Sequence, residues 1–74
     1  MAKITINKKI RFGKPIIEGT RITVDEVLGA LAGGMTYEEI EEEYDLTKED
    51  ILAALLYATK IIAEEKVGIV GIEE

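Results

Sequence analysis

The chain contains no cysteine and no histidine, and it lacks serine as well. Without thiolate or imidazole ligands, neither a disulfide nor a typical zinc site can form. The same absences remove the common nucleophiles and bases of covalent catalysis, and the glycine pattern of a phosphate-binding loop does not occur. We therefore expect a protein that is not an enzyme and that binds no metal, cofactor or small molecule.

Long apolar runs are also missing. No stretch approaches the ~20 apolar residues that span a bilayer. The N-terminal sequence MAKITINKK lacks the apolar core of a secretory signal. These absences predict a cytoplasmic protein without membrane attachment.

The chain has 74 residues and therefore little core, since a folded chain near 60 residues buries only about 60% of its extended surface. Without disulfides or zinc, tight packing or self-association must supply stability, and we expect a homodimer. The richness in Ile, Glu and Lys is a bias of hyperthermophile proteins, although an engineered or idealised sequence would look the same.

Charge is divided unevenly along the chain, whose net charge is −6. Residues 1–24 carry six basic side chains and one acidic side chain, whereas residues 25–74 carry three basic and fourteen acidic ones. The N-terminal part is therefore basic and the remainder strongly acidic.

The segment 47–65 is predicted to form the longest helix. Residues 51–58 read ILAALLYA without a charge, and Thr47 with Asp50 predicts a capped start. Two stripes have helical spacing, which predicts a helix covered on several sides; they consist of Ile51, Leu55, Ala58 and Ile62, and of Leu52, Leu56 and Thr59.

Two shorter helices are predicted before it. Thr23 with Glu26 is a capping-box pattern that opens a helix of about nine residues, which ends at the glycines 33–34. Thr36 with Glu39 is a second capping box, and its helix ends near Tyr44. The short connection to the third helix is typical of a helix-turn-helix pair.

Residues 1–23 are predicted to form strands and turns. The segments 3–7 and 10–12 alternate apolar and polar residues, which predicts a hairpin between them. Residues 16–17 are then expected to be extended, and residues 21–23 to form a last short strand. The predicted fold class is α+β, mainly α: one domain (1–74) with N-terminal strands, a three-helix bundle at 24–66 and an extended tail at 67–74.

The run GKPIIEGTRITV, residues 13–24, resembles the signature of family 433 of the domains of unknown function, small prokaryotic antitoxin-like proteins related to VapB-type antitoxins. The likeness continues through residues 27–31, the glycine break at 33–34, TYEEI at 36–40 and the segment 44–58. This resemblance implies a winged-helix-like or homeodomain-like fold, usually dimeric. It also implies pairing with a PIN-like ribonuclease toxin, and DNA binding.

Within the motif, two interpretations stay open. Residues 19–21 could form a recognition feature, but a structural turn is favoured because glycine adopts backbone angles that other residues avoid. We expect Arg21 to reach a carboxylate of Glu18, Glu26 or Asp50. The candidate motif residues are Gly13, Pro15, Gly19, Thr20 and Arg21.

DNA binding is an alternative that charge disfavours. The basic candidates are Lys8, Lys9, Arg11, Lys14 and Lys48, although lysines on short exposed strands also prevent edge pairing. The start of the third helix would face the bases, and there Lys48 stands beside two carboxylates and behind a helix with five glutamates. Such a surface repels a polyanion.

The leading hypothesis is an antitoxin-like protein that binds a ribonuclease and blocks its RNA surface by occlusion. The apolar tail could add a strand to a sheet edge of a toxin or of a sister subunit, or it could close the sheet of its own chain or swap within a homodimer. Its candidate residues are Val67, Ile69, Val70, Ile72, Glu73 and Glu74, which together with the acidic second helix would suit a basic groove. The alternatives are a winged-helix DNA-binding regulator and a purely structural or engineered oligomer.

Overall fold

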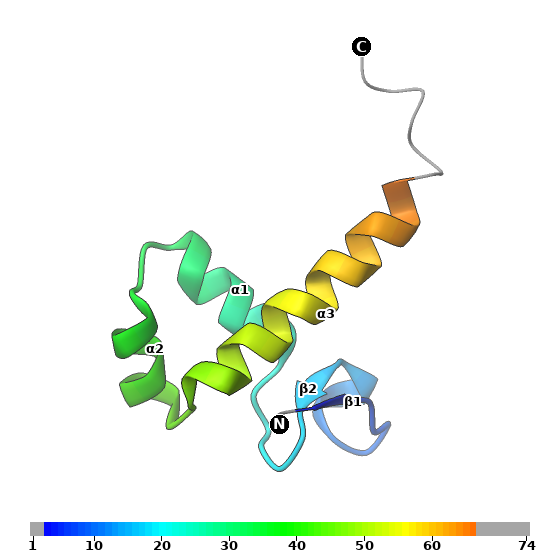
Figure 1. Ribbon diagram of the computed structural model, residues 1–74. Coiled ribbons are helices and arrows are strands. Elements are labelled where there is room, and N and C mark those ends of the chain that lie inside the picture. Colours follow the sequence, from blue (N-terminus) through cyan, green and yellow to red (C-terminus); the bar gives the residue numbers. More distant parts are fainter. Residues whose placement is uncertain (1–2, 67–74) are drawn as a thin grey trace.

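The computed structural model describes residues 3–66. Two short strands are followed by three helices, as the predicted fold class requires: β1 (Ile4–Thr5), a 3-10 turn η1 (Arg11–Gly13), β2 (Ile16–Ile17), α1 (Val24–Ala32), α2 (Tyr37–Tyr44) and α3 (Lys48–Lys66). The first half of α3 runs between the strands and the α1–α2 pair (Figure 1) and contacts all four elements. α3 is therefore the central element, as its sequence predicts.

The predicted helix starts are confirmed. In α1, the Glu26 amide donates to the Thr23 hydroxyl and the Thr23 amide donates back to the Glu26 carboxylate, at 3.0 and 2.8 Å. Thr36 and Glu39 form the same reciprocal pair at α2. Thr47 and Asp50 form one at α3, at 3.2 and 2.9 Å. Each start satisfies amides that lack a partner within the helix, so local sequence determines all three boundaries.

One apolar core joins the strands to the helices. Ile51 and Ala54 of α3 are buried against residues from every other region, and the buried cluster consists of Ile17, Val24, Val27, Ile40, Leu46, Ile51 and Ala54. The apolar side chains of α2 within residues 40–44 and those of α1 within residues 24–28 therefore pack against the first two turns of α3. This packing holds the outward faces of α2 and α3 in fixed positions.

The predicted pairing of segments 3–7 and 10–12 is wrong. β1 pairs antiparallel with β2, with Ile4 opposite Ile17 and Thr5 opposite Ile16, while Arg11 begins a 3-10 turn. Pairing with β2 is favoured because it buries both isoleucines of that strand, whereas alternation in such short segments specifies register only weakly. The expected last strand at 21–23 is reduced to one bridge, between Thr23 and Ile16.

The expected coverage of α3 on several sides holds only for its first half, and even there one side stays exposed. Leu52, Leu56 and Ile62 are 41%, 62% and 64% exposed. α3 has 19 residues and α1 has nine, so at 1.5 Å per residue α3 is about 28 Å long and α1 about 13 Å. The shorter helices therefore cover one side of the first half of α3, and its second half projects beyond them (Figure 1).

Candidate interaction surfaces

The motif segment 13–24 is a tight hairpin whose polar groups bond to one another. The Val24 amide donates to the Pro15 carbonyl and the Ile17 amide to the Ile22 carbonyl, both at 3.0 Å. Inside the bend, the Thr20 hydroxyl donates to the Ile17 carbonyl at 2.8 Å and accepts from the Ile22 amide at 3.0 Å. Gly19 turns the chain at φ 86°, a conformation that glycine adopts without steric cost.

Gly13 and Pro15 open this hairpin. Gly13 has φ 79°, and Pro15 uses its carbonyl, the one backbone hydrogen-bonding group that proline keeps. Ile16 belongs to the first arm of the hairpin, where it lies between Thr5 and Thr23, and it is buried. The five candidate motif residues therefore lie where a structural turn requires them, and this geometry supports the turn interpretation over the recognition interpretation.

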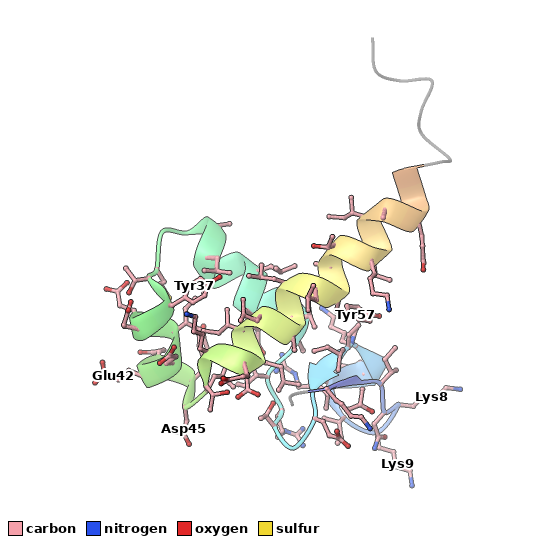
Figure 2. All side chains as sticks on the ribbon, in the orientation of Figure 1. Lys8, Lys9, Tyr37, Glu42, Asp45 and Tyr57 are labelled. Carbon is pink, nitrogen blue, oxygen red and sulfur yellow. The ribbon has the colours of Figure 1, made fainter. Side chains whose placement is uncertain are left out.

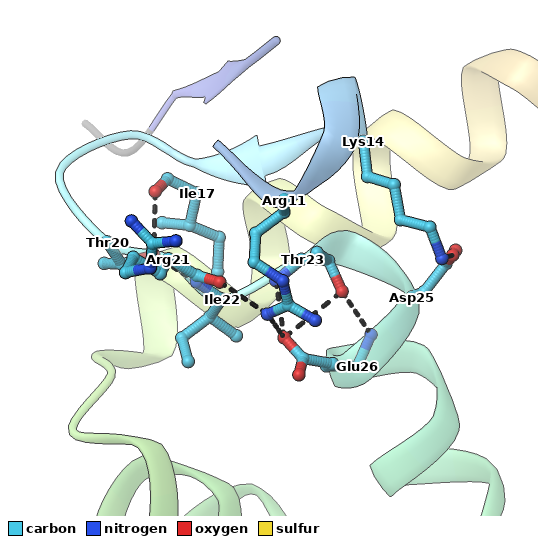
Figure 3. A network of polar contacts seen from close by, with 9 residues as sticks. All are labelled: Arg11, Lys14, Ile17, Thr20, Arg21, Ile22, Thr23, Asp25 and Glu26. Carbon is cyan, nitrogen blue, oxygen red and sulfur yellow. Dashed lines mark hydrogen bonds and ion pairs between the residues drawn. The ribbon is translucent and has the colours of Figure 1, made fainter. Parts of the chain in front are cut away.

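A polar network ties the 3-10 turn to α1 (Figure 3). Arg11 Nη1 donates to Glu26 Oε1 at 3.0 Å and to the Arg21 carbonyl at 2.9 Å. The hydrogen bond from the Thr23 amide has the largest effect and lowers the pKa of Glu26. Burial opposes it, and the Arg11 guanidinium lowers the pKa further, so the net shift is downward. Glu26 is thus both a helix cap and the anchor of the preceding turn.

The expectation that Arg21 reaches a carboxylate is wrong. Among residues 3–64, whose side chains the structure describes, the ion pairs are Arg11–Glu26 and Lys14–Asp25. Arg21 enters the network through its carbonyl. Arg11 reaches Glu26 because the 3-10 turn aims its side chain at the start of α1 (Figure 3). Sequence reasoning missed this because the residues were assigned to a strand.

The basic candidates are dispersed. Arg11 is engaged by Glu26, and Lys14 lies 3.5 Å from Asp25 in an exposed pair. Lys8 and Lys9 project into solvent from the loop after β1 (Figure 2), and Lys48 begins α3 beside α2 (Figure 1). The five residues therefore do not form one continuous cationic surface.

The exposed side of α2 is uniformly acidic. We define the acidic face as Glu38, Glu39, Glu42 and Glu43, all exposed. Buried Ile40 and half-buried Tyr44 lie on the other side of the helix. No lysine or arginine occurs between residues 21 and 48. In Figure 2, Glu42 lies at the opposite end of the molecule from Lys8 and Lys9, so the separation of charge along the sequence is kept in space.

An apolar groove separates α1 from the second half of α3. Its volume is about 320 Å³, and its lining consists of Pro15, Val24, Asp25, Leu28, Tyr57, Ala58, Ile61 and Ile62. The groove was not predicted from the sequence, because it depends on how far α3 extends beyond α1. The difference between the predicted lengths of the two helices could have indicated it.

The candidate tail residues 67–74 lie outside the described residues. Between residues 3 and 66, no helix has the length and apolar character needed to cross a membrane.

Residues 4–58 match the family described as "Protein of unknown function (DUF433)", and the chain belongs to this family. The resemblance recognised in the motif and the helices is therefore confirmed. A similar protein is "Putative antitoxin VapB45" of Mycobacterium tuberculosis, which is 28% identical over 54 residues. The match covers 73% of this chain and 23% of the relative, so the chain spans about a quarter of the relative's length. No solved structure matches.

Proposed function

We propose that this protein is an antitoxin-like binding module that pairs with a toxin and blocks it by occupying the toxin's working surface. The similarity to a protein named as an antitoxin supports this assignment. The observation that carries the mechanism is the acidic face of α2, which is exposed and held rigidly by the buried core beneath it. No chemical step is required, because occlusion needs only a complementary surface.

A ribonuclease of the PIN-like class is the proposed target. An RNA-binding groove is basic, and a row of carboxylates at helical spacing presents negative charge to it as a phosphate backbone does. The acidic face has no neighbouring cation in the sequence from residue 22 to residue 47 to neutralise it. Electrostatic complementarity of this kind accelerates association and excludes wrong partners.

The proposal includes a second contact and a homodimeric state. Residues 67–74, VGIVGIEE, contain four apolar residues and two glycines and end in two glutamates, a composition that suits strand addition to the edge of a partner's sheet. Two copies would present two acidic faces to the toxin.

DNA binding is the less supported function. Arg11 and Lys14 already pair with carboxylates, and Lys48 at the start of α3 stands beside Glu49 and Asp50. Of the five basic candidates, Lys8 and Lys9 are the two that the described part of the chain leaves exposed and away from a carboxylate. We expect no duplex binding even at low salt, where phosphate contacts are strongest.

The test is co-expression with the product of the neighbouring gene, followed by co-purification and an RNA cleavage assay. Glu42→Lys with Glu43→Lys reverses the charge of the acidic face and is expected to abolish the complex and restore cleavage. Glu18→Lys with Glu64→Lys makes the same change in net charge at exposed positions elsewhere and serves as the matched control. A chain truncated after Lys66 tests the tail separately.

An unchanged complex with the reversed acidic face would reject the occlusion surface. Equal loss of binding in both double variants would show that only net charge matters. If the neighbouring product does not bind the wild-type chain and the chain instead binds duplex DNA at low salt, the DNA-binding function replaces the antitoxin function.

A further inference from the structure

The side of α3 that faces away from the core is apolar. We define the outer stripe as Leu52, Leu56, Thr59 and Ala63, all exposed. Their spacing of four, three and four residues places them in one row along the helix. Buried Ile51 and Ala54 lie on the other side of α3, so a second helix can approach the outer stripe without disturbing the core.

The threonine in this row does not make the row polar. The Thr59 hydroxyl donates to the Leu55 carbonyl one turn earlier at 2.8 Å. Its hydrogen is therefore used within the helix, as is common for threonine in helices. No charged residue occurs between Asp50 and Lys60. The row is thus suited to close packing against another helix.

Charges along one edge of the outer stripe select the direction of that helix. Glu49 and Lys60 are exposed and lie near the same edge, eleven residues apart, which is three helical turns. Beside a parallel copy related by a two-fold axis, the same edge lies on opposite sides of the interface, so neither Glu49 nor Lys60 meets a charge of the other chain. Beside an antiparallel copy, Glu49 of each chain comes near Lys60 of the other, so two opposite-charge pairs form.

We propose that the outer stripe is the surface on which a second copy of this chain docks, with the two α3 helices antiparallel and the two-fold axis near Leu56. In this arrangement Leu56 meets its counterpart and Leu52 packs near Thr59 of the other copy. Glu49 and Lys60 are then offset by about 4.5 Å along the axis, or three residues, which their long side chains can span. Such an interface is self-complementary, as a two-fold dimer requires.

The first test is the mass of the full chain by sedimentation and light scattering. The wild type is expected at twice 8.2 kDa, and Leu52→Glu with Leu56→Glu at 8.2 kDa with an unchanged circular dichroism spectrum, because both positions are exposed in the single chain. Ile6→Glu with Phe12→Glu makes the same chemical change at two exposed apolar residues outside α3 and is expected to remain dimeric.

The second test distinguishes antiparallel from parallel docking. Glu49→Lys or Lys60→Glu alone is expected to weaken the dimer at least tenfold, and the two changes together are expected to restore it. In a parallel dimer, these edge residues would lie on opposite sides of the interface, so each single exchange would leave the affinity unchanged.

The proposal is overturned by three results. One is a monomeric wild type at all accessible concentrations. Another is a dimer that survives the changes at Leu52 and Leu56, or that is lost with those at Ile6 and Phe12 instead. The third is insensitivity to the single charge exchanges. The dimer surface rests on the homodimeric state in the proposed function. None of these results depends on toxin binding, so the dimer surface and the binding of a toxin can fail independently.

Discussion

The hairpin at residues 13–24 and the outward faces of α2 and α3 contrast in where their side chains find partners. In the hairpin, Thr20, Thr23 and the backbone around them bond internally, and Ile16 and Ile17 are buried. On the outward faces, carboxylates of α2 and leucines of α3 meet solvent. The most distinctive sequence in the chain therefore stabilises the fold, whereas less distinctive helical sequence forms the surfaces available to other molecules.

The largest expected effect is a difference in stability between substitutions at two adjacent residues of α3. Ile51→Ala removes a fully buried side chain and is expected to lower the free energy of unfolding by about 2–5 kcal/mol, as cavity-forming changes do. Leu52→Ala changes the adjacent, partly exposed side chain and is expected to cost less than about 1 kcal/mol. Urea unfolding of both variants measures the difference, and equal losses would contradict the assigned core.

The next largest effect on stability is expected from removing the helix caps. Thr23→Ala removes a buried threonine that caps α1 and is expected to cost about 1–2 kcal/mol. Thr36→Ala removes an exposed cap from α2 and is expected to cost about 0.5–1 kcal/mol. Thermal and urea unfolding measure both losses of stability. A larger loss for Thr36→Ala would contradict the expectation that the buried cap of α1 contributes more than the exposed cap of α2.

A smaller effect is a pH dependence that arises from Glu26. Its folded-state pKa lies below the ordinary value near 4.5 because the Thr23 amide and Arg11 favour the carboxylate. The stabilisation is therefore present above the unfolded pKa and is lost as pH falls through the folded pKa. The side chain is 35% exposed, so solvent reduces the effect.

Glu26→Gln is the variant that isolates this dependence. Wild type should lose more stability than the variant when urea unfolding is compared at neutral pH and at pH values below 4.5. The control Glu38→Gln alters an exposed carboxylate of the acidic face. Parallel stability curves for wild type and Glu26→Gln would show that the network around Arg11 does not favour the charged form.

The smallest effect on stability is expected on the acidic face. Glu42→Lys with Glu43→Lys changes two exposed side chains of α2 and should alter the free energy of unfolding by no more than about 0.5 kcal/mol per site. An unchanged stability together with a loss of partner binding would show that these glutamates serve the binding surface and not the fold. A large destabilisation would show that the glutamates serve the fold.

Much of the architecture could be predicted from local sequence. The three helix starts follow from threonine–carboxylate pairs three residues apart, and the end of α1 from the glycines at 33–34. The candidate surfaces were predicted less well. The glutamates of α2 were recognised as one acidic surface, but the groove beside Leu28 and the exposure of Leu56 were not foreseen.

The sequence by itself determined the helices, their boundaries and the separation of charge, because caps, periodicity and charge act over a few neighbouring residues. Tertiary structure alone decided that β1 pairs with β2, that Arg11 rather than Arg21 meets Glu26, and that one side of α3 is left uncovered. Each of these depends on which distant residues bury one another best and on the relative lengths of packed helices, which no short stretch of sequence specifies.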